Sequence, residues 1–501
     1  MNLITECFLA VARATIIATL AVWAGRAICP LLTRRWVWPL LLAPYLPPAL
    51  LVGYGYYLFA QQLPPLAKDA FYVLLVWLKL TPIAALALYF APSAMSGEAV
   101  HCWRMMGRAL ERAPTIRSRV SFWLRGEGRA PCVAFASVFL FAFGEFEIAS
   151  RLQIKTWTVT LFDAHVGGLL LSESLRLVLL PMMIQTALLI TVGALFWRSH
   201  VGAARSNLTS SPTTLGWICL GAAMVIIVII PVGFTVRGAT LGFVELMRRF
   251  ELSKELLASL AFGIGTAVCA FSVAMCSLQN LWSAGACSRF RWGSLLPPCD
   301  QSPQPKQASA AQSGSKLPQS ITAVRATTLA LSTIGLLGGL VVALLAQATF
   351  RATPLYDTPV PLLVALTLLT LPFAVLLLAL LKTFEPRAAI FVAQLADRRE
   401  IVWRLRTSEQ FWVLFLLFCW GYFELTASAI LHPSAMTPAW VRLYNLMHYG
   451  QSWLLSAMVL VAFALPFVVL GLARGTCSVI WRSKQNEPSR SDNTIAPMGL
   501  R

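Results

Sequence analysis

The chain has 501 residues, of which 58% are hydrophobic and only 12% are charged. A soluble domain carries about 25% charged residues, so this composition excludes an ordinary soluble globule. The formal charge of +19 resembles that of nucleic-acid-binding proteins, but cytosolic loops of membrane proteins also retain Lys and Arg, so we expect membrane lipid and no nucleic acid as a partner.

Apolar runs long enough to cross a hydrocarbon core recur along the whole chain. The first run, Cys7 to Cys29, is too long for the core of a signal peptide and contains Arg13 and Arg26, so we expect a retained first span. Charged or turn-forming breaks separate eleven predicted spans. These are residues 7–29, 36–60, 70–92, 131–150, 174–197, 214–236, 256–283, 324–349, 359–382, 410–430 and 452–474.

Two segments are predicted to lie outside the membrane. Residues 285–322 are rich in Pro, Ser and Gln and poor in large apolar side chains, and the tail 481–501 has a similar composition. Such segments cannot bury enough apolar surface to fold, so we expect a mobile cytosolic linker and a disordered cytosolic tail.

Basic residues are distributed unevenly between alternate loops. One set of loops and the tail holds 26 Lys and Arg residues and the other set holds nine. Because Lys and Arg are retained on the cytosolic side, this imbalance predicts a multi-pass protein of the cell inner membrane, with its N-terminus outside and its C-terminus in the cytosol.

The sequence contains no pattern typical of a metal site, a disulfide framework or a nucleotide-binding loop. The eleven cysteines include no CxxC pair, the five histidines show no HExxH spacing, and there is no GxxxxGK[ST] motif. We therefore expect no cofactor, no metal and no catalytic residue, and we expect any ATP hydrolysis to occur in a separate chain.

An internal repeat relates the two halves of the chain. Gly144-Glu145-Phe146-Glu147 matches Gly421-Tyr422-Phe423-Glu424, and the loop segment that follows, 159–163, matches 441–445. Prolines in the third and ninth spans and in the two last spans also correspond. Matching spans are six apart, so both copies cross the membrane in the same direction. The repeat predicts parallel modules, with five spans in residues 1–205 and six in residues 206–480, and a pathway at their interface.

This pattern resembles the permease subunits of ABC importers of the ferric-iron and thiamine type, in which two permease modules are fused in one chain. The resemblance covers nearly the whole chain. It rests on a basic cytosolic loop, a span ending in Gly-x-Phe-Glu, an external Val-x-Leu-aromatic-Asp/Asn segment and a last span with Leu-Pro. It implies an all-α protein that moves solute by alternating access, with two ATPase domains and a periplasmic or lipid-anchored solute-binding protein as partners.

The same resemblance implies that two cytosolic loops couple to the ATPase. In the first loop the candidates are Glu98 with Ala99, or alternatively Glu111, and both loops end in apolar residues interleaved with arginines. Neither loop keeps the glycine spacing of the family's coupling motif. Anchoring at the lipid headgroups is the alternative role for these amphipathic stretches. The remaining candidates are Leu124, Arg125, Trp403, Leu405 and Arg406.

Carboxylates near a membrane are costly unless they face water or a partner, which makes those of the repeated element functional candidates. We hypothesise an external gate formed by Phe146, Glu147, Phe423 and Glu424. The alternative is that this element only packs helices together and caps them. Asp163 and Asn445, at matching loop positions, complete the candidate set.

Two other classes of function remain open. A polytopic membrane enzyme would require a polar cluster at one face, and the sequence shows no DxD-like group in its external loops. An ion-coupled secondary transporter would place several ionisable groups in mid-membrane, where Lys79 stands almost alone in the sequence and is assigned no transport role.

Overall fold

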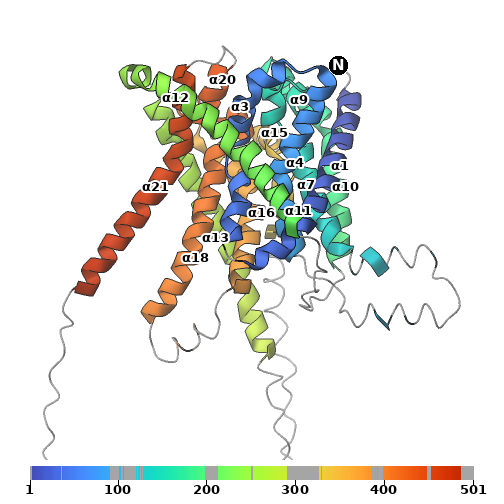
Figure 1. Ribbon diagram of the computed structural model, residues 1–501, viewed down its shortest axis with the longest axis vertical. Coiled ribbons are helices and arrows are strands. Elements are labelled where there is room, and N and C mark those ends of the chain that lie inside the picture. The colour runs from blue at the N-terminus through green and yellow to red at the C-terminus, as the bar shows by residue number, and fades with distance from the viewer. Residues whose placement is uncertain are drawn as a thin grey trace, which may run out of the picture.

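The computed structural model describes a bundle of helices (Figure 1). No strand occurs in the described part of the chain. The described residues are 3–34, 36–90, 101–102, 105, 115, 120, 122–124, 126, 128–197, 213–249, 252–289, 327–328, 330–384, 390, 392, 399–447 and 453–486.

The helices follow the apolar runs of the sequence. In the first half they are α1 (Leu3–Ile28), η1 (Cys29–Thr33), α2 (Val37–Leu42), η2 (Ala43–Tyr45), α3 (Ala49–Gln61), α4 (Pro65–Phe90), α7 (Arg129–Phe143), α8 (Glu147–Arg151), α9 (Trp157–Val166) and α10 (Leu171–Trp197). In the second half they are α11 (Thr213–Ala223), the π-helix η3 (Met224–Ile229), α12 (Ile230–Arg249), α13 (Ser253–Arg289), α15 (Gly339–Phe350), α16 (Pro359–Phe384), α18 (Arg399–Phe423), α19 (Thr426–Leu431), α20 (Ala439–Met447) and α21 (Trp453–Asn486).

Among the described residues, eight helical segments are long and apolar enough to cross a membrane, which confirms an all-α, multi-pass membrane architecture. Each coincides with one of the predicted spans. The segments are Leu3–Thr33, Pro65–Phe90, Arg129–Arg151, Leu171–Val192, Thr214–Arg248, Ser253–Ser277, Pro359–Leu378 and Trp453–Gly475.

The other three predicted spans are not single straight helices. Residues 36–60 form two segments bent by 67°, because Pro47 and Pro48 have no N–H to continue a helix. Within residues 324–349, the helix α15 starts only after Gly338, because the φ of +90° at this glycine interrupts the helical conformation. In 410–430 the apolar part of α18 is short and a second short helix, α19, follows it. The full count of eleven spans therefore stays a prediction.

The described ends of the chain lie at opposite ends of the bundle. Figure 1 shows the N-terminus at the top near α9, whereas α21 ends at the bottom, together with the lower ends of α13 and α18. An odd number of membrane crossings requires this arrangement. Which end faces the cytosol stays a prediction from the charge distribution.

Helix packing follows the same pattern in each half of the chain. In the first half α1, α4 and α7 pack against one another, and in the second half α13, α16 and α18 do the same. The half-length helix α3 packs on α8, and α15 packs on α19. Segment 213–249 joins the two sets, because α11 packs on α1 while α12 packs on both α3 and α21.

Glycines allow several of these close approaches. A Cβ on Gly25 of α1 would lie 3.0 Å from the backbone of α4, and a Cβ on Gly421 of α18 would lie 2.8 Å from Thr266 of α13. At Gly242 a Cβ would lie only 2.0 Å from the carbonyl oxygen of Trp453. Small residues at helix contacts are how membrane helices gain van der Waals packing, since burial from lipid provides little driving force.

Candidate functional site

At the break in the second predicted span, a lysine of the neighbouring helix donates a hydrogen bond to a free backbone carbonyl. Lys79 of α4 donates a hydrogen bond to the carbonyl oxygen of Pro47, and its ammonium lies 5.8 Å from the centre of the Tyr45 ring. A helix that stops within the membrane leaves carbonyl groups without donors, which costs free energy unless another group satisfies them. The Lys79 ammonium therefore stabilises the carbonyl side of this break.

On the other side of the same break, a glutamate accepts a hydrogen bond from a free backbone N–H at the start of α3. The backbone N–H of Leu50, in the first turn of α3, donates to Oε2 of Glu147 over 2.8 Å. The start of α3 carries the positive end of its helix dipole, so an anionic acceptor is favourable there. Lys79, which stands almost alone in the sequence of its span, interacts electrostatically with both Glu147 and Glu145 in the folded chain.

Two further carboxylates cap the short helices that follow α7 and α18. Glu145 accepts from the N–H groups of Ile148 and Ala149, at 2.6 and 3.1 Å. Glu424 accepts from the N–H group of Ala427, at 2.9 and 3.1 Å to its two oxygens, and from that of Ser428 at 3.3 Å. In each case the short helix begins two residues after the glutamate. By this geometry the counterpart of Glu424 is Glu145, whereas the alignment of the Gly-x-Phe-Glu letters pairs it with Glu147.

These groups meet where the two halves of the chain touch. Glu147 interacts electrostatically with Glu424, Glu145 and Lys79. A Cβ on Gly144, at the end of α7, would lie 3.9 Å from the Cα atom of Gly338, just before α15. All three glutamates are half-buried rather than sealed in the core. We call Lys79, Glu145, Glu147 and Glu424 the junction cluster.

The helix α15 starts against this cluster. A Cβ on Gly339, its first residue, would lie 2.5 Å from Oε1 of Glu424. Tyr72 of α4, in the same half of the chain, hydrogen-bonds to Glu145. Two half-length helices, α3 and α15, therefore begin next to carboxylates at the junction, as expected for discontinuous helices whose positive ends face a polar site.

One functional candidate was missed in the sequence. Gln185 of α10 has no exposed surface, and neither its amide nitrogen nor its amide oxygen has a partner among the described residues. Its Nε2 lies 3.8 Å from the position that a Cβ on Gly144 would occupy. The available signal was that Gln185 is the only amide side chain in the span 174–197. A buried unpaired amide requires an explanation, and its place beside the junction supplies a functional one.

The four proposed gate residues are brought together only in part. Glu147 and Glu424 interact electrostatically, but the two phenylalanines occupy different surroundings. Phe146 lies between Phe162 and Tyr444, with ring centres 4.4 and 5.9 Å away. Phe423 instead packs in the second half, on Trp440 and Phe463 at 5.5 and 6.1 Å. The other two candidates, Asp163 on α9 and Asn445 on α20, are exposed.

Polar contacts link the two halves near Phe146. The hydroxyl groups of Ser150 and Tyr444 are 2.8 Å apart. Arg151 is buried, places its guanidinium 4.7 Å from the centre of the Tyr57 ring, and donates to the carbonyl oxygen of Met447 over 3.4 Å. The helix α8 therefore contacts α20 as well as α3.

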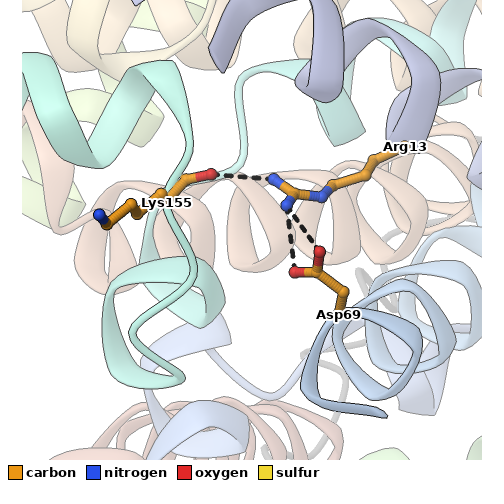
Figure 2. A network of polar contacts seen from close by, with 3 residues as sticks. All are labelled: Arg13, Asp69 and Lys155. Carbon is orange, nitrogen blue, oxygen red and sulfur yellow. Dashed lines mark hydrogen bonds and ion pairs between the residues drawn. The ribbon is translucent and has the colours of Figure 1, made fainter. Parts of the chain in front are cut away.

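An ion pair connects helices α1 and α4 within the first half of the chain. Arg13 of α1 donates to both oxygens of Asp69, at 2.9 and 3.1 Å, and to the carbonyl oxygen of Lys155 at 2.9 Å (Figure 2). Figure 2 shows the Arg13 guanidinium between the other two residues, so one side chain connects α1, α4 and the segment before α9. In this charge-assisted pair a single guanidinium nitrogen, Nη2, donates to both oxygens of Asp69, while Nη1 donates to Lys155.

The coupling candidates fall largely outside the described residues. Glu98, Ala99, Glu111 and Arg125 are not described. Leu124 is described and half-buried. The backbone of Trp403, Leu405 and Arg406 belongs to the first part of α18, whereas their side chains are not described.

The junction cluster contains three carboxylates and one cation, and the amide of Gln185 lies beside it, which suits this region to bind or pass a polar or charged group. In the ranges that the structure describes, no three His, Cys, Asp or Glu side chains are placed to hold a metal ion. Comparison with known proteins found no matching family model, no matching curated protein and no matching solved structure. The junction cluster and the recurring helix packing are therefore the basis on which a function is proposed.

Proposed function

We propose that the chain is the permease subunit of an ATP-driven importer, with two parallel modules, residues 1–205 and 206–480, that form one solute pathway. The observation that carries this proposal is the recurrence of the same packing in both halves. The trio α1, α4 and α7 has its counterpart in α13, α16 and α18, and the contact of α3 with α8 has its counterpart in that of α15 with α19.

Side-chain contacts recur together with the helices. The ring of Phe143, the last residue of α7, lies 5.4 Å from that of Trp157, and the ring of Phe423, the last residue of α18, lies 5.5 Å from that of Trp440. Both contacts connect the end of a spanning helix to the start of the following amphipathic helix. This recurrence supports a repeat that preserves structure as well as letters.

A second recurring contact lies at the amphipathic helices themselves. Thr160 of α9 donates to Glu6 of α1, and Arg442 of α20 donates to Glu255 of α13. Thr160 and Arg442 occupy the same position in the repeated loop segment, one residue after its valine. Each of these helices therefore contacts the first helix of the packed trio in its own half, α1 or α13.

In this proposal the pathway runs through the junction cluster. Two parallel modules are related by an axis along the membrane normal, and the elements nearest to each other across that axis line the pathway. Gly144 and Gly338 are such a pair, and Glu147 with Glu424 is another. Half-length helices next to a polar cluster are typical of alternating-access transporters.

The hypothesis of an external gate is kept for Glu147 and Glu424, with Phe146 as the aromatic group at the contact between modules. Substituting both glutamates by glutamine preserves shape and removes charge. A gate role predicts that solute uptake is lost, or that ATP hydrolysis is uncoupled from uptake, at normal membrane levels of the protein. Unchanged uptake, or loss explained by poor accumulation, supports a packing and capping role instead.

Partners and solute follow from the resemblance to the fused permeases. We propose two ATPase domains on the cytosolic side, a periplasmic or lipid-anchored binding protein outside, the inner membrane as location, and ferric iron or thiamine as candidate solutes. The test is purification of the tagged chain from its native membranes in mild detergent. Specific recovery of an ATPase, with hydrolysis that depends on this chain, is the expected result, and recovery without any ATPase contradicts the proposal.

The junction cluster also favours an ion-coupled secondary transporter as a second candidate. Four ionisable groups interact there, and such groups within the membrane mark ion pathways. The two candidates differ in their energy source. Uptake that stops when the proton gradient is collapsed at constant ATP, by a chain that purifies alone, establishes the secondary transporter.

A further inference from the structure

A cavity separate from the junction cluster lies between α3, α4, α12 and α21. Its volume is about 680 Å³, within the range of roughly 300–1,000 Å³ that is usual for ligand sites. Most of its lining is apolar, and the residues come from both halves of the chain. The apolar and aromatic members include Phe59, Phe71, Leu74, Ile230 and Phe234.

The cavity borders the lipid-facing surface of the bundle. Leu58 and Phe59 on α3 and Phe234 on α12 line it and are also exposed, with 59%, 51% and 56% of their surfaces accessible. Large apolar side chains exposed on helices that span a membrane contact hydrocarbon rather than water. A lipid chain in the bilayer therefore has direct access to this cavity.

The inner wall of the cavity contains no polar group in need of a ligand. The hydroxyl groups of Tyr54 and Ser456 are 2.7 Å apart, and the Tyr56 hydroxyl donates to the carbonyl oxygen of Ile226 over 2.7 Å. That carbonyl belongs to the π-helix η3, where the hydrogen-bond ladder of the helix is locally altered. With these groups satisfied, the interior is mainly apolar, which suits hydrocarbon rather than a polar solute.

The rim of the cavity differs from its interior. Arg237 of α12 lines the cavity and is exposed, and its guanidinium has no partner among the described residues. It directly follows the predicted span 214–236 and lies within the longer helical segment Thr214–Arg248, whose 35 residues exceed the roughly 20 that cross the hydrocarbon core. Trp453, the first residue of α21, also lines the cavity and is 57% exposed. A cationic side chain beside a tryptophan at the end of a span is the arrangement expected at the lipid headgroups.

We propose that this cavity is a specific phospholipid site, in which an acyl chain occupies the apolar interior and the lipid phosphate binds the Arg237 guanidinium. The lipid contacts α3 and α4 on one side and α12 and α21 on the other. It therefore fills the seam between the first half of the chain and the last helix of the second. This inference requires only the membrane location of the chain and is independent of the proposed transport function.

The experiment uses the full chain purified in mild detergent, delipidated, and titrated with phosphatidylglycerol while bound lipid is counted by native mass spectrometry. Arg237→Gln removes the cation, and Leu74→Trp and Ile230→Phe each fill the interior. Arg248→Gln is the matched control, because Arg248 is an exposed arginine on the same helix that does not line the cavity. Thermal unfolding of each variant shows whether it is folded.

Loss of one arginine contact to a lipid headgroup, at about 1 kcal/mol, corresponds to about fivefold weaker binding. We expect this loss for Arg237→Gln, recovery for Arg237→Lys, none for Arg248→Gln, and loss of the bound lipid in at least one folded cavity-filling variant. Equal binding by the Arg237→Gln and Arg248→Gln variants overturns the phosphate contact. Full binding by both filled variants overturns the acyl site. Equal binding of diacylglycerol, which has no phosphate, shows that the occupant is not selected as a phospholipid and also overturns the proposal.

Discussion

Substitution of Gly242 by alanine separates two helices that join the halves of the chain. The new Cβ would lie 2.0 Å from the carbonyl oxygen of Trp453, whereas ordinary contact begins at 3.4 Å, so α12 and α21 must separate by about 1.4 Å at that point. Overpacking of this kind costs about 1–3 kcal/mol. Gly233 lies on the same helix, and a Cβ there meets nothing within 4 Å. Because alanine is the better helix former, Gly233→Ala stabilises by about 0.5–1 kcal/mol.

The two alanine variants are therefore expected to shift stability in opposite directions. The assay is thermal unfolding of the purified chain in one detergent, followed by the loss of a monodisperse peak in size-exclusion chromatography. Gly242→Ala should lower the midpoint and Gly233→Ala should leave it unchanged or raise it. A Gly242→Ala variant as stable as the wild type refutes the close approach of α12 and α21. Equal destabilisation by both substitutions attributes the effect to glycine in this helix rather than to the contact.

Three further predictions concern single contacts. Glu147→Leu leaves the Leu50 N–H without its acceptor and should destabilise the folded chain by about 1–3 kcal/mol. Glu147→Gln keeps an acceptor and should destabilise it less. Equal unfolding midpoints for the two variants would contradict the capping role of Glu147. Burial lowers the pKa of His165 below its usual value. The contribution of the neutral imidazole to stability is therefore complete above about pH 6.5 and is lost as the pH falls. The unfolding midpoint of His165→Asn should fall less on acidification than that of the wild type, and an equal fall in both would refute this. Arg13→Gln breaks the ion pair with Asp69 and should cost about 1 kcal/mol in the same melting assay. The effect should be smaller in an Asp69→Asn background, where only the bond to the Lys155 carbonyl is left to lose, and an equal effect in both backgrounds would refute a contribution from the pair.

The apolar runs of the sequence predicted the long helices well, because length and hydropathy alone decide whether a helix suits a bilayer. They did not predict where helices stop inside the bundle. Pro47 and Pro48 lie within the predicted span 36–60, but the complete break at 67° depends on Lys79 and Glu147, which satisfy the freed backbone groups. Those two residues are far from the break in sequence, so only the tertiary packing brings them to it.

The repeat shows the same limit in its register. The sequence alignment of the two copies pairs Glu147 with Glu424, whereas the hydrogen bonds that cap the short helices pair Glu145 with Glu424. The reason is local. The helix α7 ends at Phe143, and Gly144 separates it from Glu145, which caps the following helix α8. The helix α18 ends at Phe423, and the corresponding capping residue, Glu424, follows directly. Gln185 was missed for a related reason, because a single amide in an apolar run has meaning only once its burial and its lack of a partner are known.

The number of copies of this chain in its native complex tests the two-module proposal most directly. If residues 1–205 and 206–480 supply both halves of one pathway, native mass spectrometry of the complex extracted from its own membranes gives one copy of this 54.9 kDa chain with two ATPase domains. A complex that contains two copies of the chain, or no ATPase at all, contradicts the proposal.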